Sequence, residues 1–540
     1  MQKFQDDLEL EARGYRREMP RQFSVFSLVA LSFSLTCTWS GTGSSLGISI
    51  KEASAAGTLW SILVAAVMTG ILSAGVAELA SAFPVAGAQY YWAFCVSSKE
   101  YRAFASYMNG WLSILGWWLA SASACNFIAS LILSIAYLWY PDYESQSWHQ
   151  WLIYVGVTWL GVALNTFGSQ LLPTFNRCIC KQSFQRKPIL NCSIHSNMLF
   201  MIPVFLACTT LSATTITLFV CSRNNHAPAN WTFSDTTNGT GWKSDGLAFI
   251  LSVSNAVYAF LGTDCGAHMC EEIRNPAKNA PKVILFPVLI GLVTAWPFAC
   301  SCMNAIVDVD AVLNTPSGVP LIEIYYQSTQ SKEASTVLLA LFAFCFFGCT
   351  VANGTTCSRT IWAVSRDNLM PFSNIWSKVH SGFQIPLNAL CLSGSVVSLY
   401  GLIFLGSTNA FSAMVGAAVI FLQTSCALPQ LIVLWRGRDA TLPERPFSLG
   451  RFGVAVNFIA VVWVTFLDIL FFLPTELPVT KGNMNYISVV SMGLTSIVLA
   501  LYWFSKRGKY LGPQMPQEVQ VNEGRDVEDE NELSHSMKKQ

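Results

Sequence analysis

One stretch decides how this chain folds: Thr38-Trp39-Ser40-Gly41-Thr42-Gly43-Ser44-Ser45-Leu46-Gly47. It places three glycines inside an apolar run that is otherwise long enough to cross a lipid bilayer. A second stretch, Tyr258-Ala259-Phe260-Leu261-Gly262-Thr263-Asp264, interrupts another apolar run of membrane length. Paired interruptions in corresponding segments of two halves are typical of membrane proteins whose ligand site lies at the middle of the bilayer.

The composition is that of a membrane protein. Of the 540 residues, 52% are hydrophobic and only 12% are charged, whereas soluble domains average about 25% charged residues. The net charge of +1 provides no field that would attract nucleic acid. Residues 1–21 are polar and lack a cleavage site, so we expect no signal peptide and a first apolar segment that stays in the mature chain.

Twelve apolar segments meet the requirement of about 20 mainly apolar residues for a helix that crosses the hydrocarbon core. None of them alternates with period two, which argues against a β-barrel. The expected fold is therefore an all-α polytopic membrane protein with 12 transmembrane helices. The predicted spans are 23–50, 57–83, 104–138, 149–168, 198–221, 245–266, 283–307, 334–357, 387–406, 409–434, 453–474 and 485–505.

The Lys and Arg residues predict the orientation of these spans. With the N-terminus in the cytoplasm, 27 of the 32 fall on the inner side and five on the outer side. This split follows the positive-inside rule and predicts that both termini are cytoplasmic. The predicted outer loop 223–244 carries the glycosylation acceptors Asn230-Trp231-Thr232 and Asn238-Gly239-Thr240.

The two glycine-containing stretches are the candidate binding site. A broken helix exposes N–H groups that suit a carboxylate and carbonyl groups that suit an ammonium ion or another cation. The alternative is that the small residues only allow close helix packing. The candidate substrate-binding residues are Trp39, Ser40, Gly41, Thr42, Gly43, Ser44, Tyr258, Phe260, Gly262 and Asp264.

Two carboxylates near these spans are further candidates. Asp264 lies within a span, where a charge is costly, so it is expected to pair with a substrate amine, relay a proton or orient the unwound backbone. The alternative is that it caps a helix at the inner margin. Glu78 is either a salt-bridged residue at the end of a span or part of an inner gate, with Arg359, Arg366 and Asp367 as possible partners.

No metal or other cofactor is expected. Most of the 17 cysteines lie in apolar runs, where Cys behaves as a small hydrophobic residue. They lack the spacing of zinc or redox pairs. His268 and Cys270 lie near Cys265 without a second ligand pair, and no nucleophile or metalloprotease motif occurs.

Four pieces of sequence, the first of them within the stretch quoted above, carry a resemblance to a known family. They are Trp39-Ser40-Gly41-Thr42-Gly43-Ser44; Ala77-Glu78-Leu79 with Phe83-Pro84-Val85-Ala86-Gly87-Ala88-Gln89-Tyr90-Tyr91-Trp92; Asp264 with His268-Met269-Cys270-Glu271-Glu272-Ile273-Arg274-Asn275-Pro276 and Pro281; and Ser358-Arg359-Thr360-Ile361-Trp362-Ala363-Val364-Ser365-Arg366-Asp367 with Pro371. Over about residues 12–510 the chain resembles the amino acid–polyamine–organocation superfamily, and within it the fungal amino acid/choline transporters, which include GABA and choline permeases.

The resemblance implies a 5+5 inverted repeat plus two C-terminal helices, with spans 1 and 6 unwound around the substrate. It also implies alternating access, usually driven by a proton gradient in fungi. The organisation expected is a cytoplasmic N-terminal segment (1–21), a first repeat (22–222), an extracellular loop (223–244), a second repeat (245–434), spans 11–12 (453–505) and a disordered cytoplasmic tail (506–540). Within it, residues 177–196 are interpreted as a basic cytoplasmic loop or an atypical insertion.

The coupling ion stays open at this point. Some proton-coupled relatives carry a Lys in span five, but residues 197–222 contain no Lys or Arg. Hydroxyl groups in span eight are of the kind that binds sodium in related folds. The candidate coupling or gating residues are Glu78, Asp264, Arg359, Thr355 and Thr356.

The leading hypothesis is a secondary transporter of amino acids or small amines such as GABA or choline, coupled to protons or, alternatively, to sodium, and acting in a lipid bilayer without nucleic acid. One alternative substrate is a nitrogenous secondary metabolite or its precursor. The alternative of another class is a nutrient receptor on a transporter scaffold. The plasma membrane is the expected location, with the vacuolar membrane as the alternative.

Overall fold

A computed structural model of the protein describes residues 2–19, 25–182, 191–480 and 483–513, and every regular element in these ranges is helical. Residues 514–540 of the expected disordered tail (506–540) and residues 183–190 of the atypical segment lie outside the described residues. The α-helices are α1 (Gln2–Ala12), α2 (Val25–Thr36), α3 (Thr38–Ala82), α4 (Gln89–Val96), α5 (Arg102–Trp139), α6 (Ser147–Gln182), α7 (Asn191–Cys221), α8 (Ala229–Ser234), α9 (Asp245–Tyr258), α10 (Cys265–His268), α11 (Pro276–Ala305), α12 (Val309–Leu313), α13 (Pro320–Thr329), α14 (Lys332–Arg366), α15 (Ser373–Trp376), α16 (Leu387–Gly406), α17 (Thr408–Arg436), α18 (Arg438–Thr441), α19 (Gly453–Phe471) and α20 (Ile487–Leu501). Short 3₁₀ turns η1 (Ser222–Asn224), η2 (Cys270–Glu272) and η3 (Gly450–Phe452) and a π-turn η4 (Tyr502–Lys506) complete the described part of the chain.

Ten helical segments in the described part of the chain are long and apolar enough to cross a membrane, two fewer than the sequence predicts. One difference is the 56-residue segment Ser27–Ala82, which covers two predicted spans. At 1.5 Å per residue a straight helix of that size would be about 84 Å long, far more than a bilayer core of about 30 Å. Non-helical backbone at Ala53 (φ −145°) and Ser54 (φ 53°) divides α3, which makes up most of this segment, into two helical parts.

The other difference is the predicted span 245–266. There α9 has only 14 residues and α10 only four, so neither is long enough to be counted alone. The ten segments are Ser27–Ala82, Arg102–Trp139, Ser147–Gly168, Phe205–Asn224, Pro276–Ala305, Lys332–Arg366, Leu387–Gly406, Val415–Arg436, Gly450–Phe471 and Ile487–Lys506.

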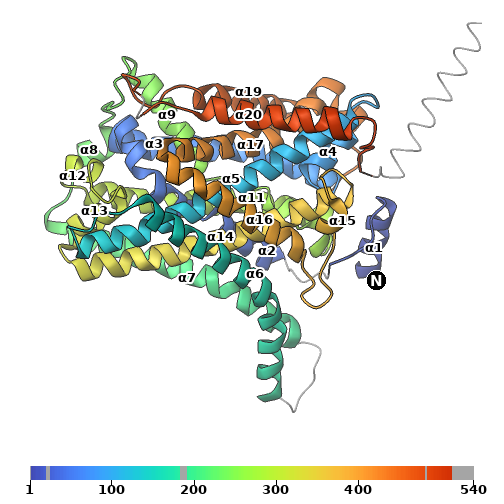
Figure 1. The fold of residues 1–540 in the computed structure, drawn as a ribbon, viewed down its shortest axis with the longest axis horizontal. Coiled ribbons are helices and arrows are strands. Elements are labelled where there is room, and N and C mark those ends of the chain that lie inside the picture. The colour runs from blue at the N-terminus through green and yellow to red at the C-terminus, as the bar shows by residue number, and fades with distance from the viewer. Residues whose placement is uncertain (1, 20–24, 183–190, 481–482, 514–540) are drawn as a thin grey trace, which may run out of the picture.

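The long helices run roughly along one axis of the molecule, and the short ones gather at its two ends (Figure 1). At one end lie α8, α12 and α13, and at the other lie α1 and α15. Tyr15 donates a hydrogen bond to Asp367 (2.8 Å), and Lys506 donates one to the carbonyl of Asn368 (2.6 Å). The N-terminal segment and the end of the described chain therefore meet at one end, which is called the inner end below after the orientation expected from the sequence.

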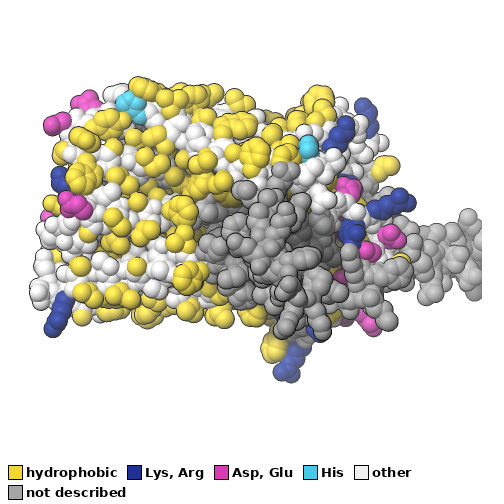
Figure 2. All heavy atoms as spheres, turned by 90° about the horizontal axis from the view of Figure 1, so that it is seen from below, with side chains coloured by type: hydrophobic (Ala, Val, Ile, Leu, Met, Phe, Trp, Pro, Cys, Tyr) yellow, Lys and Arg dark blue, Asp and Glu magenta, His cyan; other side chains and the backbone are white. Residues whose placement is uncertain are grey.

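The surface suits a bilayer. Figure 2 shows hydrophobic side chains spread along one face, while Lys, Arg, Asp and Glu gather toward the two ends of the long axis. On α19 and α20, large apolar side chains such as Phe458 and Val489 are exposed. Because a soluble protein would rarely expose so much apolar surface, these helices are expected to contact lipid.

The loop 223–244 holds the turn within α3 at the other end, called the outer end below. The carbonyl of Asp235 accepts a hydrogen bond from Ala56 N–H (3.1 Å), and its carboxylate accepts one from the Ser54 hydroxyl (2.5 Å). The Ser54 and Thr237 hydroxyls lower the pKa of Asp235, although partial burial acts in the opposite direction. Lys51 adds an ion pair with Glu476 (2.6 Å).

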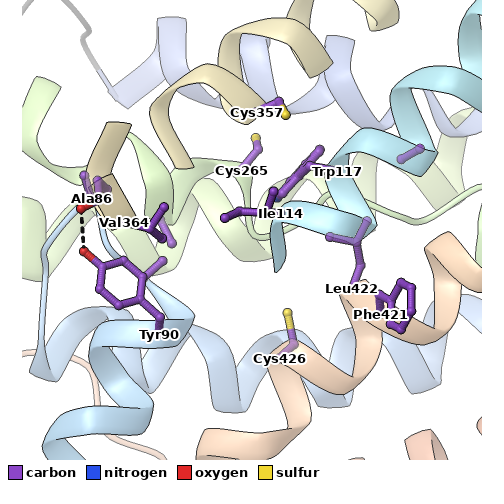
Figure 3. Packing of buried hydrophobic residues seen from close by; sticks show 14 of the residues in the cluster. Ala86, Tyr90, Ile114, Trp117, Cys265, Cys357, Val364, Phe421, Leu422 and Cys426 are labelled. Atoms are coloured by element: carbon purple, nitrogen blue, oxygen red, sulfur yellow. Dashed lines mark hydrogen bonds between the residues drawn. The ribbon is translucent and has the colours of Figure 1, made fainter. Parts of the chain in front are cut away.

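Helices α5 and α17 cross at a glycine. A Cβ atom on Gly116 would lie 2.6 Å from Leu422 Cγ and 3.1 Å from the Leu422 backbone nitrogen. Glycine is required here because the backbone of α17 approaches α5 closely. Trp117, the next residue, and Leu422 thereby reach the interior together (Figure 3).

We expect Gly116→Ala to destabilise the fold by about 1–3 kcal/mol through overpacking, measured as a lower melting temperature of the protein in detergent. The control is Gly156→Ala in α6, where a Cβ would meet no atom within 4 Å. That control should be neutral or gain up to about 1 kcal/mol from helix propensity. Equal melting temperatures for the two variants would contradict the close crossing of α5 and α17.

Candidate functional site

The first interruption lies at Cys37, immediately before the stretch that the sequence singled out. Cys37 has left-handed backbone (φ 36°, ψ 47°), and it separates α2 from α3. Its carbonyl accepts hydrogen bonds from the N–H groups of Ser40 and Gly41, both at 2.9 Å. The expectation that residues 38–47 are unwound is therefore wrong, because these residues form the first turns of α3.

The glycines of this stretch allow neighbouring parts of the chain to pack closely against α3. A Cβ on Gly41 would lie 3.0 Å from the Cα of Ala259, so the first interruption packs directly against the second. A Cβ on Gly43 would lie 2.8 Å from Phe342 Cζ and 3.3 Å from Phe298 Cε1. Gly43 thus follows the alternative reading from the sequence, close packing through small residues.

The second interruption is where the sequence predicted it. Helix α9 ends at Tyr258, and residues 259–264 form turns before α10 begins at Cys265. Gly262 has φ +82°, and a Cβ there would also meet Leu35 and, at 3.1 Å, Trp117. Only glycine meets both demands without strain, the positive φ and the missing space.

A small cavity of about 40 Å³ lies between the two interruptions. It has room for about one to three water molecules, whereas pockets that hold small ligands are about 300–1,000 Å³. A molecule the size of an amino acid therefore enters only if helices or side chains move. The cavity is lined by Leu35, Thr36, Gly41, Trp117, Ala120, Ala124, Tyr258, Leu261, Gly262, Phe346, Cys349, Asn353 and Leu422.

Three of the predicted residues, Gly41, Tyr258 and Gly262, line this cavity. The Tyr258 hydroxyl lies 2.7 Å from the Ser123 hydroxyl of α5, which fixes its ring at the cavity wall. Sequence reasoning missed the residues just before the quoted stretch and those contributed by α5, α14 and α17. Of these residues only Asn353 could have been noticed from the sequence, because it is a polar amide within the apolar span of α14.

The other residues of the first stretch face away from the cavity. Trp39 is fully buried and meets the rings of Phe298 and Phe342 edge-on, with centroids 5.3 and 5.2 Å apart. The hydroxyls of Ser40 and Ser44 bond to the carbonyls of Cys37 (2.9 Å) and Gly41 (2.6 Å).

Two more predicted residues are also buried away from it. The Thr42 hydroxyl has no hydrogen-bond partner among the described residues. Phe260 belongs to the same apolar cluster as Trp39, Phe298 and Phe342. Neither residue lines the cavity.

Asp264 lies beyond the cavity, toward the inner end. It is buried, and its Oδ2 accepts a hydrogen bond from the Gln89 side-chain amide of α4. The same oxygen lies 3.4 Å from Nε2 of His268. Gln89 and His268 were not expected at the site, although the four-residue spacing of Asp264 and His268 would place them on one face of a helical turn.

Glu78 does not pair with Arg359, Arg366 or Asp367. Instead its carboxylate binds Arg438 (2.6 and 2.7 Å) and Arg445 (2.8 Å), and it also accepts the N–H of Leu449 at 3.0 Å. The partners expected from the sequence form other contacts. The arginines that do bind Glu78 belong to the 436–451 segment, about 360 positions after Glu78 in the sequence. No local pattern connects residues so far apart.

The proposed partners of Glu78 instead hold the segment that follows the second interruption. Arg359 binds Glu272 (2.5 and 3.2 Å), and Arg366 binds Glu271 (2.8 and 3.1 Å). Each is a two-point contact between a guanidinium and a carboxylate, the strongest ion-pair geometry.

Asp367 accepts hydrogen bonds from Tyr15 (2.8 Å) and Tyr90 (2.7 Å). Burial raises the pKa of Asp367, although Arg366 and these two hydroxyls act in the opposite direction. This carboxylate therefore joins the N-terminal segment, α4 and the end of α14.

The hydroxyls of α14 do not face the cavity. Thr355 donates to Asn165 of α6 (2.5 Å), and Thr356 donates to the carbonyl of Ala352 in its own helix (3.2 Å). In the part of the chain that the structure describes, no group of three His, Cys, Asp or Glu is arranged to hold a metal ion.

Replacing Glu78 with Ala should destabilise the protein by about 3–5 kcal/mol, because two partly buried arginines lose the buried carboxylate that they share. The measurement is the melting temperature of the purified protein. Glu444→Ala, which removes an exposed carboxylate from the same inner region, serves as the control and should leave the melting temperature unchanged. A Glu78→Ala protein as stable as wild type would mean that the two ion pairs contribute nothing.

Comparisons of the sequence with family models and with known proteins agree on one family. The family model described as Amino acid permease matches residues 23–182 and 190–495. A choline transporter of Saccharomyces cerevisiae is 30% identical over 508 residues, which cover 94% of this chain and 84% of the relative. Amino-acid permease BAT1 of Arabidopsis thaliana is 30% identical over 518 residues, covering 94% and 96% of the two chains.

A more distant relative is a 7-keto 8-aminopelargonic acid transporter of Saccharomyces cerevisiae, 26% identical over 534 residues that cover 87% of this chain and 90% of the relative. The family match and the two relatives at 30% identity extend across most of the chain and include both interruptions. The chain therefore belongs to the amino acid permease family of the amino acid–polyamine–organocation superfamily.

Proposed function

We propose that the protein is a secondary transporter of an amino acid or a small amine such as GABA or choline. The observation that carries this proposal is the meeting of two interrupted helices, Gly41 against Ala259, around a cavity within a bundle of apolar helices. Relatives named for choline, amino acids and 7-keto 8-aminopelargonic acid support the substrate class. A permease family also favours transport over an enzymatic reaction.

The chemistry of the cavity fits such a substrate. The rings of Trp117, Tyr258 and Phe346 line it, and aromatic faces attract an ammonium group. Leu35 and Thr36, at the end of α2, line the cavity, and the Leu35 carbonyl would have to exchange the Cys349 thiol for the ammonium group. At the start of α3 the Ser40 and Gly41 N–H groups are bound to the Cys37 carbonyl, so the helix dipole would be what attracts a carboxylate there. The amide of Asn353 is a further polar contact.

The proposed architecture has twelve spans in a 5+5 inverted repeat with two C-terminal helices. In this proposal the segment Ser27–Ala82 supplies spans 1 and 2, divided at Ala53 and Ser54, and α9 with α10 forms the broken span 6. The repeats would then be residues 22–222 and 245–434, with the loop 223–244 outside.

Alternating access would require the inner ion pairs to separate. Arg359 and Arg366 hold Glu272 and Glu271 just beyond the second interruption, so closing and opening of the inner end would act through the same short segment. Glu78, between two arginines, is in a setting that favours the ionised carboxylate. We therefore assign Glu78 to closure of the inner end and Asp264 to coupling, with the proton as the coupling ion.

The proposed location is the plasma membrane, with both termini in the cytoplasm and the loop 223–244 outside. Asn230 is exposed in α8 and is available to carry a glycan. The Asn238 side chain is half-buried and donates to the carbonyl of Trp242 (2.7 Å). Asn230 is therefore the better presented of the two acceptors.

The test of function is uptake into liposomes that contain the purified full-length chain. Vesicles preloaded with unlabelled compound are diluted into labelled amino acids, GABA or choline, and exchange is followed without any ion gradient. We expect saturable exchange of at least one of these probes, inhibited by its unlabelled form. Specific binding of a probe with no exchange would favour a receptor, and neither binding nor exchange would overturn the proposed substrate class.

Gly41→Ala should weaken exchange of whichever probe the wild type accepts. The new methyl group would press on the Ala259 backbone at a cost of about 1–3 kcal/mol, which lowers the affinity by about 10- to 100-fold. Gly348→Ala in α14, where a Cβ meets no atom within 4 Å, is the matched control and should exchange normally. Normal exchange by both variants would argue against a substrate site between the interruptions.

A further inference from the structure

A buried polar cluster separates the cavity from the inner ion pairs. It consists of Asp264, His268 and Gln89, which expose 3%, 1% and 0% of their surface. Gln89 donates its side-chain N–H to Asp264 Oδ2, and His268 Nε2 lies 3.4 Å from the same oxygen. Among the described residues, neither Lys nor Arg forms an ion pair with Asp264.

The environment of the imidazole fixes one of its protons. His268 Nδ1 lies 3.3 Å from the carbonyl oxygen of Ala86, and a carbonyl oxygen only accepts hydrogen bonds. Nδ1 must therefore carry a hydrogen atom. In a neutral imidazole the other nitrogen, Nε2, then carries only a lone pair. It is buried without a hydrogen-bond partner among the described residues, and Asp264 Oδ2, another acceptor, lies 3.4 Å away.

One additional proton removes this conflict. It either makes His268 an imidazolium that donates from Nε2 to the carboxylate, or it sits on Asp264 Oδ2 and is donated to Nε2. Both arrangements give the pair a net charge of zero. In a buried site, where an uncompensated charge is costly, the neutral total is the favoured state.

We propose that Asp264 and His268 together form the binding site for the coupling proton. This inference rests on the proposed function, because it names the ion that would be coupled to transport, and it adds His268 as a site residue. The proton binds to the shared position between Oδ2 and Nε2 and leaves from it to water when the inner end opens. One proton is gained and one is released in each cycle, so charge is balanced.

The other groups that face the pair are neutral or already paired. Cys265 and Cys426 lie near Asp264, and the Cys265 thiol contacts the Ser32 hydroxyl of α2 (3.0 Å). From α5 come Trp117 and Asn109, whose amide donates to the carbonyl of Gln89 (2.9 Å). From α14 and η2 the charged groups are the pairs Arg359–Glu272 and Arg366–Glu271.

On one side the cluster contacts the cavity, and on the other it contacts the inner ion pairs. Trp117 lines the cavity and meets the His268 ring edge-on, with centroids 6.2 Å apart. The backbone of Ala86 contacts both groups. Its carbonyl accepts from His268, and its N–H donates to Glu271 (3.2 Å), the partner of Arg366. A change of protonation at His268 can therefore be transmitted both to the cavity wall and to the inner closure.

Four unpartnered atoms support a cluster that rearranges. The side-chain carbonyl oxygens of Gln89 and Asn109, the indole N–H of Trp117 and Nε2 of His268 are buried without a hydrogen-bond partner among the described residues. Such groups are costly to leave unpaired in a fixed structure. In the proposed cycle Gln89 and Trp117 form hydrogen bonds with new partners when the proton binds or is released.

The test uses the full-length chain in liposomes loaded with a pH-sensitive dye, with labelled amino acids, GABA and choline as probes. Exchange without a gradient is compared with accumulation driven by an imposed pH gradient. We expect His268→Gln to lose about tenfold of the stimulation by the pH gradient, measured relative to its own exchange without a gradient, together with the acidification that follows uptake. His149→Gln, which changes an outer histidine bonded to Tyr143, is the matched control and should behave as wild type.

A second variant distinguishes loss of the proton site from a folding defect in His268→Gln. Asp264→Asn should also lose the stimulation, and the double variant should lose no more than either single one if both residues hold the same proton. The proposal is overturned if His268→Gln or Asp264→Asn keeps full stimulation, or if the wild type exchanges a probe but ignores the pH gradient. A wild type that exchanges no probe would instead overturn the proposed function itself.

Discussion

The structure depends on satisfying backbone groups that two broken helices would otherwise leave unpaired inside the membrane. Water is absent from the bilayer core, so such groups need protein partners or a sealed polar cavity. The Cys37 carbonyl accepts two N–H groups of α3, and the Cys349 thiol donates to the carbonyl of Leu35. Gly41 lets the second interruption press against the first, and α5, α14 and α17 enclose both.

The inner end shows how one short segment serves two purposes. Between the second interruption and α11, fewer than twenty residues contain Asp264, His268, Glu271 and Glu272. The first two face α4 and the cavity wall, and the last two are held by arginines of α14. In the proposed transport cycle a shift at the interruption would therefore act on the ion pairs as well, because only a few residues separate them.

Much of the fold could be predicted because hydropathy is a local property. The apolar spans and the interruption at Gly262 follow from residues that are neighbours in sequence. The break at Cys37 could not be predicted, since a non-glycine residue adopts left-handed backbone there only in a surrounding structure that holds it. The arginine partners of Glu78 and the contact of His268 with Ala86 join distant segments, so neither left a local pattern.

The small size of the cavity has a consequence for ions. A space of about 40 Å³ beside the two interruptions holds only a few water molecules, fewer than an ion keeps around itself in solution. An ion that entered it would have to lose most of its hydration shell at great cost. The cavity in this conformation therefore offers an ion no hydrated resting place within the bundle.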